Sequence, residues 1–233
     1  LRRLEPVNGL RFYHALGFWL LAWLPLLDLI IRDFTWHDNK LWDIIIVLTV
    51  PVVLTLLVAL FGKRLPWPTG QYYTGYMTLG VAPLIFVLVV FSVVHNFSHN
   101  GDSTPYAYLP LLNPVSLVHL IVLGTLAVWL VQLQKAVAAP SGLRPLWFIW
   151  AILFFIWFNA DVARIVHHFW GIPFEFEALL QSSLLQAVYS IIWTLLAMGL
   201  MFTGTRLARR WLWLVGATLL AITVLKLLVL DLA

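Results

Sequence analysis

The sequence predicts an all-α, polytopic integral membrane protein. Hydrophobic residues make up 62% of the chain, charged residues make up only 10%, and the mean hydropathy is +0.94. A soluble domain carries about 25% charged residues, so this composition lies far outside the soluble range. Apolar runs of about 20 residues, the length that a helix needs to cross a bilayer, recur along the whole chain. We therefore expect residues 1–233 to form one transmembrane helical domain.

Seven runs have spanning length, and each is expected to form one transmembrane helix. The second and third contain Pro51 and Pro83, which neighbouring helices can accommodate in a membrane. The fourth follows Asn113 and Pro114, where a proline suits the first helical turn, and the fifth begins at Pro145. The expected helices cover residues 12–31, 41–61, 73–97, 115–136, 145–169, 175–202 and 211–230.

The basic residues alternate between the two sides of this arrangement. Only Arg32 and Lys40 lie in the loops on one side, and Arg164 and Lys226 lie inside helices. Basic loops stay on the cytoplasmic side of a membrane, so we expect a cytoplasmic N-terminus and an extracytoplasmic C-terminus. The other ten basic residues share the expected cytoplasmic side: Arg2, Arg3, Arg11, Lys63, Arg64, Lys135, Arg144, Arg206, Arg209 and Arg210.

Composition and motifs exclude several functional classes. The formal net charge is +4, but the basic residues lie at helix ends rather than in one patch, which argues against a nucleic-acid partner. The chain has no Cys, so disulfides, thiolate metal sites and Cys nucleophiles are excluded. It has no Gly-rich phosphate loop, nucleophile elbow or HExxH motif. We expect membrane lipids as partners and no cofactor, and no motif assigns a reaction.

Polar residues gather toward the expected extracytoplasmic ends of the helices. A charge near the centre of a bilayer costs roughly 2.5 kcal/mol or more, so such residues usually face a partner or a wet cavity. The gathering therefore predicts a functional site open to the outer leaflet. Its members are Asp28, Asp43, His95, Asn96, His99, Asp102, Asn113, His119, Asp161, Arg164, His167, His168, Glu175, Gln181, Ser182, Gln186, Lys226 and Asp231.

Helical spacing indicates how this site is built. Asp161, Arg164 and His168 follow i, i+3 and i+7 and share one helix face. The fifth and sixth helices are joined by a short turn at 171–173, so we expect them to be antiparallel neighbours. A second polar stripe opens the sixth helix and consists of Ser182, Gln186, Tyr189 and Trp193. The two stripes predict a pocket, to which Lys226 contributes a second cation.

Two interpretations of the charged residues remain open. Asp161 and Arg164 could form an intrahelical ion pair that stabilises insertion, because buried charges are generally paired. Alternatively, Arg164 and Lys226 bind an anionic headgroup or phosphate, since a guanidinium fork suits such groups. Asp161 would then orient Arg164, and His168 or His167 would be the catalytic acid or base. Ser182 and Gln186 either line the pocket or connect helices.

A metal site is a further possibility at the end of the third helix. His95 and His99 have the i, i+4 spacing that can place two imidazoles on one metal, with Asp102 as a third ligand. Asn100 and Gly101 indicate that the helix ends there, which argues against the required geometry. We therefore do not predict a metal centre.

Three separated segments resemble a known bacterial family. Residues 105–114 resemble its "PYLPLLNP" stretch, residues 164–171 its "R..HH..G" helix end, and residues 224–232 its closing "VLKLFLVDL". The family is the group of predicted membrane proteins called domain of unknown function 2339. The resemblance covers residues 100–233 and draws attention to matching residues in these motifs, namely Asn113, Arg164, His167, His168, Lys226 and Asp231.

The resemblance implies a bacterial cytoplasmic-membrane location and no particular activity. Because family members are longer, it also implies that this chain is a C-terminal portion with further transmembrane helices as partners. The leading functional hypothesis is a site that binds or modifies an anionic or lipid-linked envelope substrate. The alternatives are a segment of a transporter or channel, for which the inner half of the chain is poor in polar groups, and a non-catalytic scaffold.

Overall fold

The computed structural model describes residues 41–102, 107–137 and 140–231, together with positions 13, 15–17 and 19. Every regular element in these ranges is a helix, which confirms the predicted all-α class. The chain divides into two compact units, residues 1–158 and residues 159–233. The boundary falls inside one long helix, and each unit is described by itself below.

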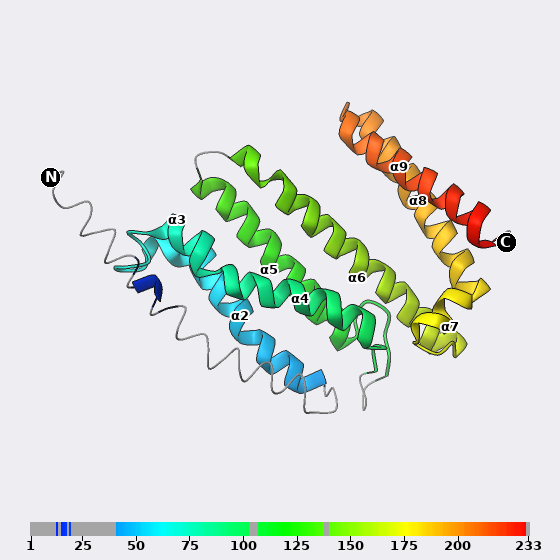
Figure 1. Cartoon of the computed structure of the whole chain (residues 1–233), viewed down its shortest axis with the longest axis horizontal. Helices are drawn as coiled ribbons and strands as arrows, with labels where there is room; N and C mark the ends of the chain where they lie inside the picture. Colours follow the sequence, from blue (N-terminus) through cyan, green and yellow to red (C-terminus); the bar gives the residue numbers. More distant parts are fainter. Residues whose placement is uncertain are drawn as a thin grey trace. The chain divides into compact units, whose positions relative to one another are not determined.

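Unit 1 is built around three helices that run side by side, α2, α4 and α5 (Figure 1). α2 packs against both of the others, and Trp150, on the following helix, donates a hydrogen bond to the Leu123 carbonyl of α5 over 2.8 Å. The elements in order are α2 (Leu41–Phe61), η2 (Gly62–Arg64), α3 (Tyr73–Gly75), η3 (Tyr76–Gly80), α4 (Ala82–Ser98), α5 (Pro114–Ala136), η4 (Pro140–Leu143) and the first part of α6 (Arg144–Trp170).

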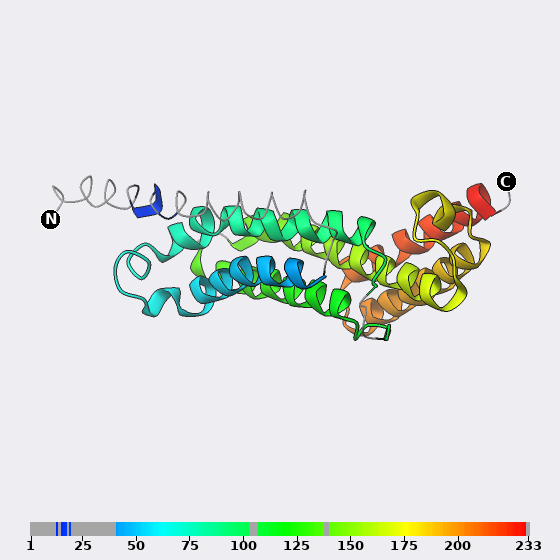
Figure 2. The same cartoon turned by 90° about the horizontal axis from the view of Figure 1, so that it is seen from below.

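Unit 2 contains the end of α6 and an antiparallel helical pair, α8 and α9, which both views show side by side (Figures 1 and 2). The short helix α7 joins α6 to α8 across a break at Ser182. After α6, the elements in order are α7 (Phe176–Gln181), α8 (Ser183–Arg206), α9 (Arg210–Lys226) and η5 (Leu227–Asp231).

Five helical segments among the fully described residues are long and apolar enough to cross a membrane. α2, with 21 residues, has the bounds expected of the second predicted span. The first predicted span, residues 12–31, lies mostly outside the described residues. The total of seven spans and the orientation of the termini therefore stay predictions. The five segments are Tyr73–Ser98, Pro114–Ala136, Ser141–Trp170, Ser183–Arg206 and Arg210–Val229.

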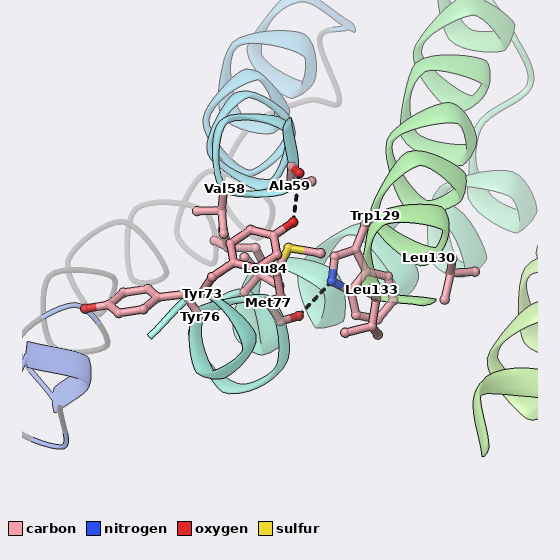
Figure 3. Close-up of a cluster of buried hydrophobic side chains, with 10 residues drawn as sticks. Val58, Ala59, Tyr73, Tyr76, Met77, Leu84, Trp129, Leu130 and Leu133 are labelled. Carbon is pink, nitrogen blue, oxygen red and sulfur yellow. Dashed lines mark hydrogen bonds between the residues drawn. The ribbon is translucent and has the colours of Figure 1, made fainter. Parts of the chain in front are cut away.

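A buried cluster at one end of unit 1 joins the ends of α2, α4 and α5 (Figure 3). Its polar atoms are bonded across the cluster: the Tyr73 hydroxyl donates to the Ala59 carbonyl over 3.0 Å, and the Trp129 indole donates to the Met77 carbonyl over 2.9 Å. The cluster is thus held by hydrogen bonds as well as by packing. It comprises Val58, Ala59, Tyr73, Tyr76, Met77, Val81, Leu84, Trp129, Leu130 and Leu133.

The bond from Trp129 is needed because of a π-helical turn. Within η3 the Val81 N–H donates to the Tyr76 carbonyl five residues earlier, over 3.0 Å, so the Met77 carbonyl loses its α-helical donor. In a membrane no water can replace that donor. The indole N–H of Trp129 reaches Met77 from the neighbouring helix and satisfies the carbonyl. This tryptophan therefore connects helices rather than lying in an interfacial aromatic belt.

Two glycines allow α8 and α9 to pack closely. A Cβ at Gly216 would lie 2.7 Å from the Ala197 carbonyl oxygen, and one at Gly204 would lie 2.6 Å from the Trp213 backbone nitrogen. Small residues at helix interfaces let backbones approach in membranes, where dispersion contacts drive association. The sequence has no GxxxG motif, so motif scanning did not reveal this interface.

We expect Trp129→Phe to destabilise the protein by about 1–3 kcal/mol, because the Met77 carbonyl would remain buried without its donor. The measurement is the midpoint of thermal unfolding of the purified protein in detergent. Trp170→Phe is the matched control, because Trp170 is exposed at the end of α6. Equal midpoints for the two variants would contradict the proposed role of the indole.

Gly216→Ala is expected to destabilise the packing of α8 on α9 by about 1–3 kcal/mol, since overpacked sites require backbone movement. Gly199→Ala, in α8, has no atom within 4 Å of the added Cβ and should leave the midpoint unchanged or slightly raised. Thermal unfolding of both variants tests this expectation. An unchanged unfolding midpoint for Gly216→Ala would show that close packing at Gly216 does not stabilise the pair of helices α8 and α9.

Candidate functional site

The second part of α6 places a carboxylate and a guanidinium in the protein interior. Asp161 is 1% exposed and Arg164 is 0% exposed, and their spacing of three residues puts them on one helix face. The helix continues through them without a break. Complete burial of an arginine within a candidate membrane span is rare and expensive. Arg164 and Asp161 are therefore the strongest functional candidates in unit 2.

The two histidines that follow lie at the C-terminal end of α6. The Nδ1 atom of His167 lies 2.6 Å from the Ile172 carbonyl, and because a carbonyl only accepts, Nδ1 carries the proton. This bond closes the turn at Gly171, where φ is +70°. The rings of His167 and His168 are 4.8 Å apart, and both side chains are half-buried. The tautomer of His167 leaves Nε2 as its basic nitrogen.

Two of the predicted pocket residues organise the junction of α7 and α8. The Ser182 hydroxyl accepts from the Leu185 N–H over 3.2 Å and so caps α8. The side-chain amide of Gln186 donates to the carbonyls of Leu179 and Leu180 over 3.4 and 3.2 Å, which are orphan acceptors at the end of α7. The predicted stripe is thus interrupted, because Ser182 lies outside the helix that holds the other three residues.

Lys226 connects α9 to α8. Its ammonium donates to the Gln186 carbonyl over 2.9 Å and to the Ser190 hydroxyl over 2.8 Å, and Ser190 in turn donates to the same carbonyl. These bonds fix the position of the ammonium beside Gln186. Asp231 ends η5 in the same unit, and its side chain lies outside the described part of the chain.

Asn159 is a connecting residue that the sequence analysis did not single out. Its side-chain oxygen accepts from the Trp193 indole over 2.8 Å, and its backbone carbonyl accepts from the Tyr189 hydroxyl over 2.9 Å. These bonds confirm that α6 and α8 are neighbours. The signal that could have found Asn159 is an amide inside an apolar run, two residues before Asp161.

The remaining candidate, Asn113, belongs to unit 1 and caps α5. Its side-chain oxygen accepts from the Ser116 N–H over 2.9 Å, and its amide donates to the Ser116 hydroxyl over 3.0 Å. Asn113 is buried and is followed by Pro114 in the first turn. The motif at 105–114 therefore ends in a helix-initiation signal, and Asn113 acts there as an N-cap.

Unit 1 also contains a group of stacked aromatic rings on α4 and α5. His95 stacks on Phe91 at 4.7 Å and on His99 at 4.8 Å, and the His119 ring centroid is 5.2 Å from that of His95. All four side chains are buried. The analysis of the sequence placed His119 near this end of the helices but did not predict its approach to His95.

Hydrogen bonds define the protonation of two of these rings. The Nδ1 atom of His119 donates to the Val115 carbonyl over 2.8 Å, whereas Nδ1 of His99 accepts from the Gly101 N–H over 3.0 Å. A neutral His99 therefore carries its proton on Nε2, which opposes metal ligation. Asp102 is exposed, and among the described residues no group of three or more His, Asp or Glu side chains is arranged to hold a metal.

The structure thus brings together three helices of unit 2 through polar contacts, which we call the polar layer. Its bonded members are Asn159 of α6, Gln186, Tyr189, Ser190 and Trp193 of α8, and Lys226 of α9. Ser182 and His167 serve the adjoining turns instead. Asp161 and Arg164 are buried in the same stretch of α6, two and five residues after Asn159.

Comparison with known proteins extends the resemblance seen in the sequence. Residues 2–233 match the family described as "Predicted membrane protein (DUF2339)", so the match reaches well beyond residues 100–233. Neither the curated proteins nor the solved structures contain a match to this chain. The family match covers nearly the whole chain, and the structure has helices that are long and apolar enough to cross a membrane. The chain therefore belongs to the DUF2339 family of predicted membrane proteins, whose function is unknown.

Proposed function

We propose that this membrane protein binds or modifies an anionic or lipid-linked envelope substrate at the polar layer of unit 2. Arg164 and Lys226 bind the anion, Asp161 orients Arg164, and His168 or His167 acts as the acid or base. The site opens toward the outer leaflet of a bacterial cytoplasmic membrane, with the C-terminus on the extracytoplasmic side. The observation that carries the proposal is the complete burial of Arg164 beside Asp161 in a candidate span.

The chemistry of these groups suits such a substrate. A guanidinium offers a planar fork that matches phosphate and carboxylate oxygens, and burial strengthens its attraction for an anion because the local dielectric is low. Lys226 is held in place by two hydrogen bonds that its ammonium donates to α8, which reduces the entropy lost when an anion binds. His167 is oriented by its bond to Ile172, as an acid or base must be.

A non-catalytic scaffold is the second candidate, and the hydrogen bonds favour it at specific positions. Lys226 joins α8 to α9, Ser182 caps α8 and Asn113 caps α5. In this alternative Asp161 and Arg164 contribute to stability alone. The two functions predict different results for a variant that keeps the charges of Asp161 and Arg164 but exchanges their positions.

The first test is the identity of what co-purifies with the protein. Arg164→Lys keeps the charge but loses the fork, and Lys226→Gln removes the second cation. We expect each to lower the amount of co-purifying anionic molecule about tenfold, because a charge-assisted hydrogen bond contributes about 1.5–3 kcal/mol. Mass spectrometry of the extracted ligand measures this. Arg206→Gln, an exposed position at the other end of α8, is the control.

Wild-type amounts of ligand in both variants, or no anionic molecule in the wild-type protein, would remove the basis of the proposal. Thermal unfolding is measured in parallel, so that loss of ligand is interpreted only for folded variants. Flux of a solute across proteoliposomes that requires Arg164 would instead assign the residue to a transport path.

The second test exchanges the charges of the pair on α6. Arg164→Gln leaves the Asp161 carboxylate buried without its arginine and should destabilise the protein by about 3–5 kcal/mol. The double variant Asp161→Arg/Arg164→Asp should recover part of this loss but bind no anion, because the guanidinium is displaced by one helical turn. A double variant that recovers both stability and ligand would support the scaffold instead.

A further inference from the structure

Unit 1 contains a basic hollow that takes no part in the polar layer. It has a volume of about 660 Å³ and opens at the ends of two candidate spans, Tyr73–Ser98 and Pro114–Ala136. Lys63 and Lys135, which are 72 positions apart in the sequence, meet at its wall. The helix ends that carry them therefore lie at the same end of unit 1. The other lining side chains used below are Gln71, Tyr72, Tyr73 and Thr74.

The floor of the hollow is rigid. Tyr73 is buried, and its hydroxyl donates to the Ala59 carbonyl over 3.0 Å (Figure 3). A Cβ at Gly62 would lie 2.9 Å from the Tyr73 ring, and a Cβ at Gly70 would lie 2.2 Å from the Leu65 carbonyl oxygen. Both glycines are thus required for the chain to pass this close, and the hollow is a built feature of the fold.

The charge of the hollow is positive. The Lys63 ammonium lies 5.1 Å from the centre of the Tyr73 ring, a cation–π contact that holds the charge over the floor. Lys135 reaches the wall from the last turn of α5, beside Ala136 whose carbonyl accepts from the Thr74 hydroxyl over 3.4 Å. Among the residues that the structure describes, the lining contains two lysines and no carboxylate. An anion is the ligand that this combination fits.

The position of the hollow relative to the spans indicates the kind of anion. The ends of helices that cross the hydrocarbon core lie at the level of the lipid headgroups. Trp67, 58% exposed, and Leu65, 41% exposed, flank the hollow in the same connection, where an interfacial tryptophan and an apolar side chain can meet acyl chains. Basic pockets between transmembrane helices bind anionic headgroups.

We propose that the hollow between Lys63 and Lys135 binds the phosphate of an anionic phospholipid. The phosphate lies between the two ammonium groups, the polar side chains of Gln71 and Thr74 face the rest of the headgroup, and the acyl chains extend along the apolar ends of the helices. This site shares no residue with the site of the proposed function, so each proposal can be tested independently of the other.

The experiment is native mass spectrometry of the full chain in detergent, titrated with phosphatidylglycerol or phosphatidylcholine. The wild-type protein should bind phosphatidylglycerol more tightly. Lys63→Gln and Lys135→Gln should each reduce that preference about fivefold, since one basic residue near a membrane surface contributes about 1 kcal/mol. The pair Lys63→Arg/Lys135→Arg should retain it.

Two controls separate a site from general surface charge. Arg206→Gln/Arg210→Gln removes two exposed basic residues between α8 and α9 and should leave the preference unchanged. Gln71→Trp keeps every charge but narrows the hollow, and should weaken the preference. Equal losses in the single variants Lys63→Gln or Lys135→Gln and in Arg206→Gln/Arg210→Gln, or full binding by Gln71→Trp, would overturn the proposal. Circular dichroism and size-exclusion chromatography check that each variant is folded.

The source of the phosphate is tested in the same titration. Inorganic phosphate at concentrations equal to the lipid should fail to displace phosphatidylglycerol, because it lacks the acyl chains that meet the apolar helix ends. Complete displacement by inorganic phosphate would show that the hollow takes a soluble phosphate and would overturn the lipid assignment.

Discussion

The structure depends on one constraint, which is that lipid offers no hydrogen-bonding partner to a polar group. A donor or acceptor inside a span can therefore be satisfied only by the protein itself. The helices meet this requirement locally through hydroxyls that return to their own backbone, as Thr125 and Thr194 do. Between helices they meet it through long side chains, such as Trp129, Trp193 and Lys226.

This constraint distinguishes polar residues whose burial is explained by hydrogen bonds between helices from polar residues whose burial is not. An interhelical hydrogen bond in a membrane contributes about 0.6 kcal/mol on average, and a neutral amide such as Asn159 supplies it. A buried charge costs several times more. Arg164 is fully buried, and this cost is why we propose a role in binding, rather than in packing alone, for Arg164 and Asp161.

Helix positions could be predicted from the sequence because hydropathy and length determine where a chain can cross a bilayer. The second expected span, 41–61, coincides with α2, and the fourth and fifth differ from α5 and α6 by one residue at their ends. The break at Ser182 was missed because polar spacing suggested one continuous stripe, although a serine before an apolar run is also an N-cap signal. The π-helical turn at 76–80 depends on tertiary bonds that spacing does not encode.

Site residues were harder to predict, because residue type alone does not reveal which partner a side chain reaches. Asn113, Ser182 and Gln186 have the chemistry of ligand-binding groups, yet each satisfies a helix terminus. Conversely, Asn159 was not singled out, and His119 was placed among the outer polar residues without a predicted partner. Only the approach of α8 to α6, and of α5 to α4, gives these two residues their contacts.

Within unit 1, basic and imidazole chemistry occupy opposite ends of the same helix. His119 lies near the start of α5 and Lys135 lies in its last turn, a separation of roughly 24 Å at the usual helical rise. Basic residues at helix ends fix the side of the membrane on which a loop remains. If Lys63 and Lys135 also hold an anionic headgroup, the basic residues expected to orient the chain are the same residues that bind the lipid. The apolar interior of the helices then separates the charge of the headgroup from the histidines.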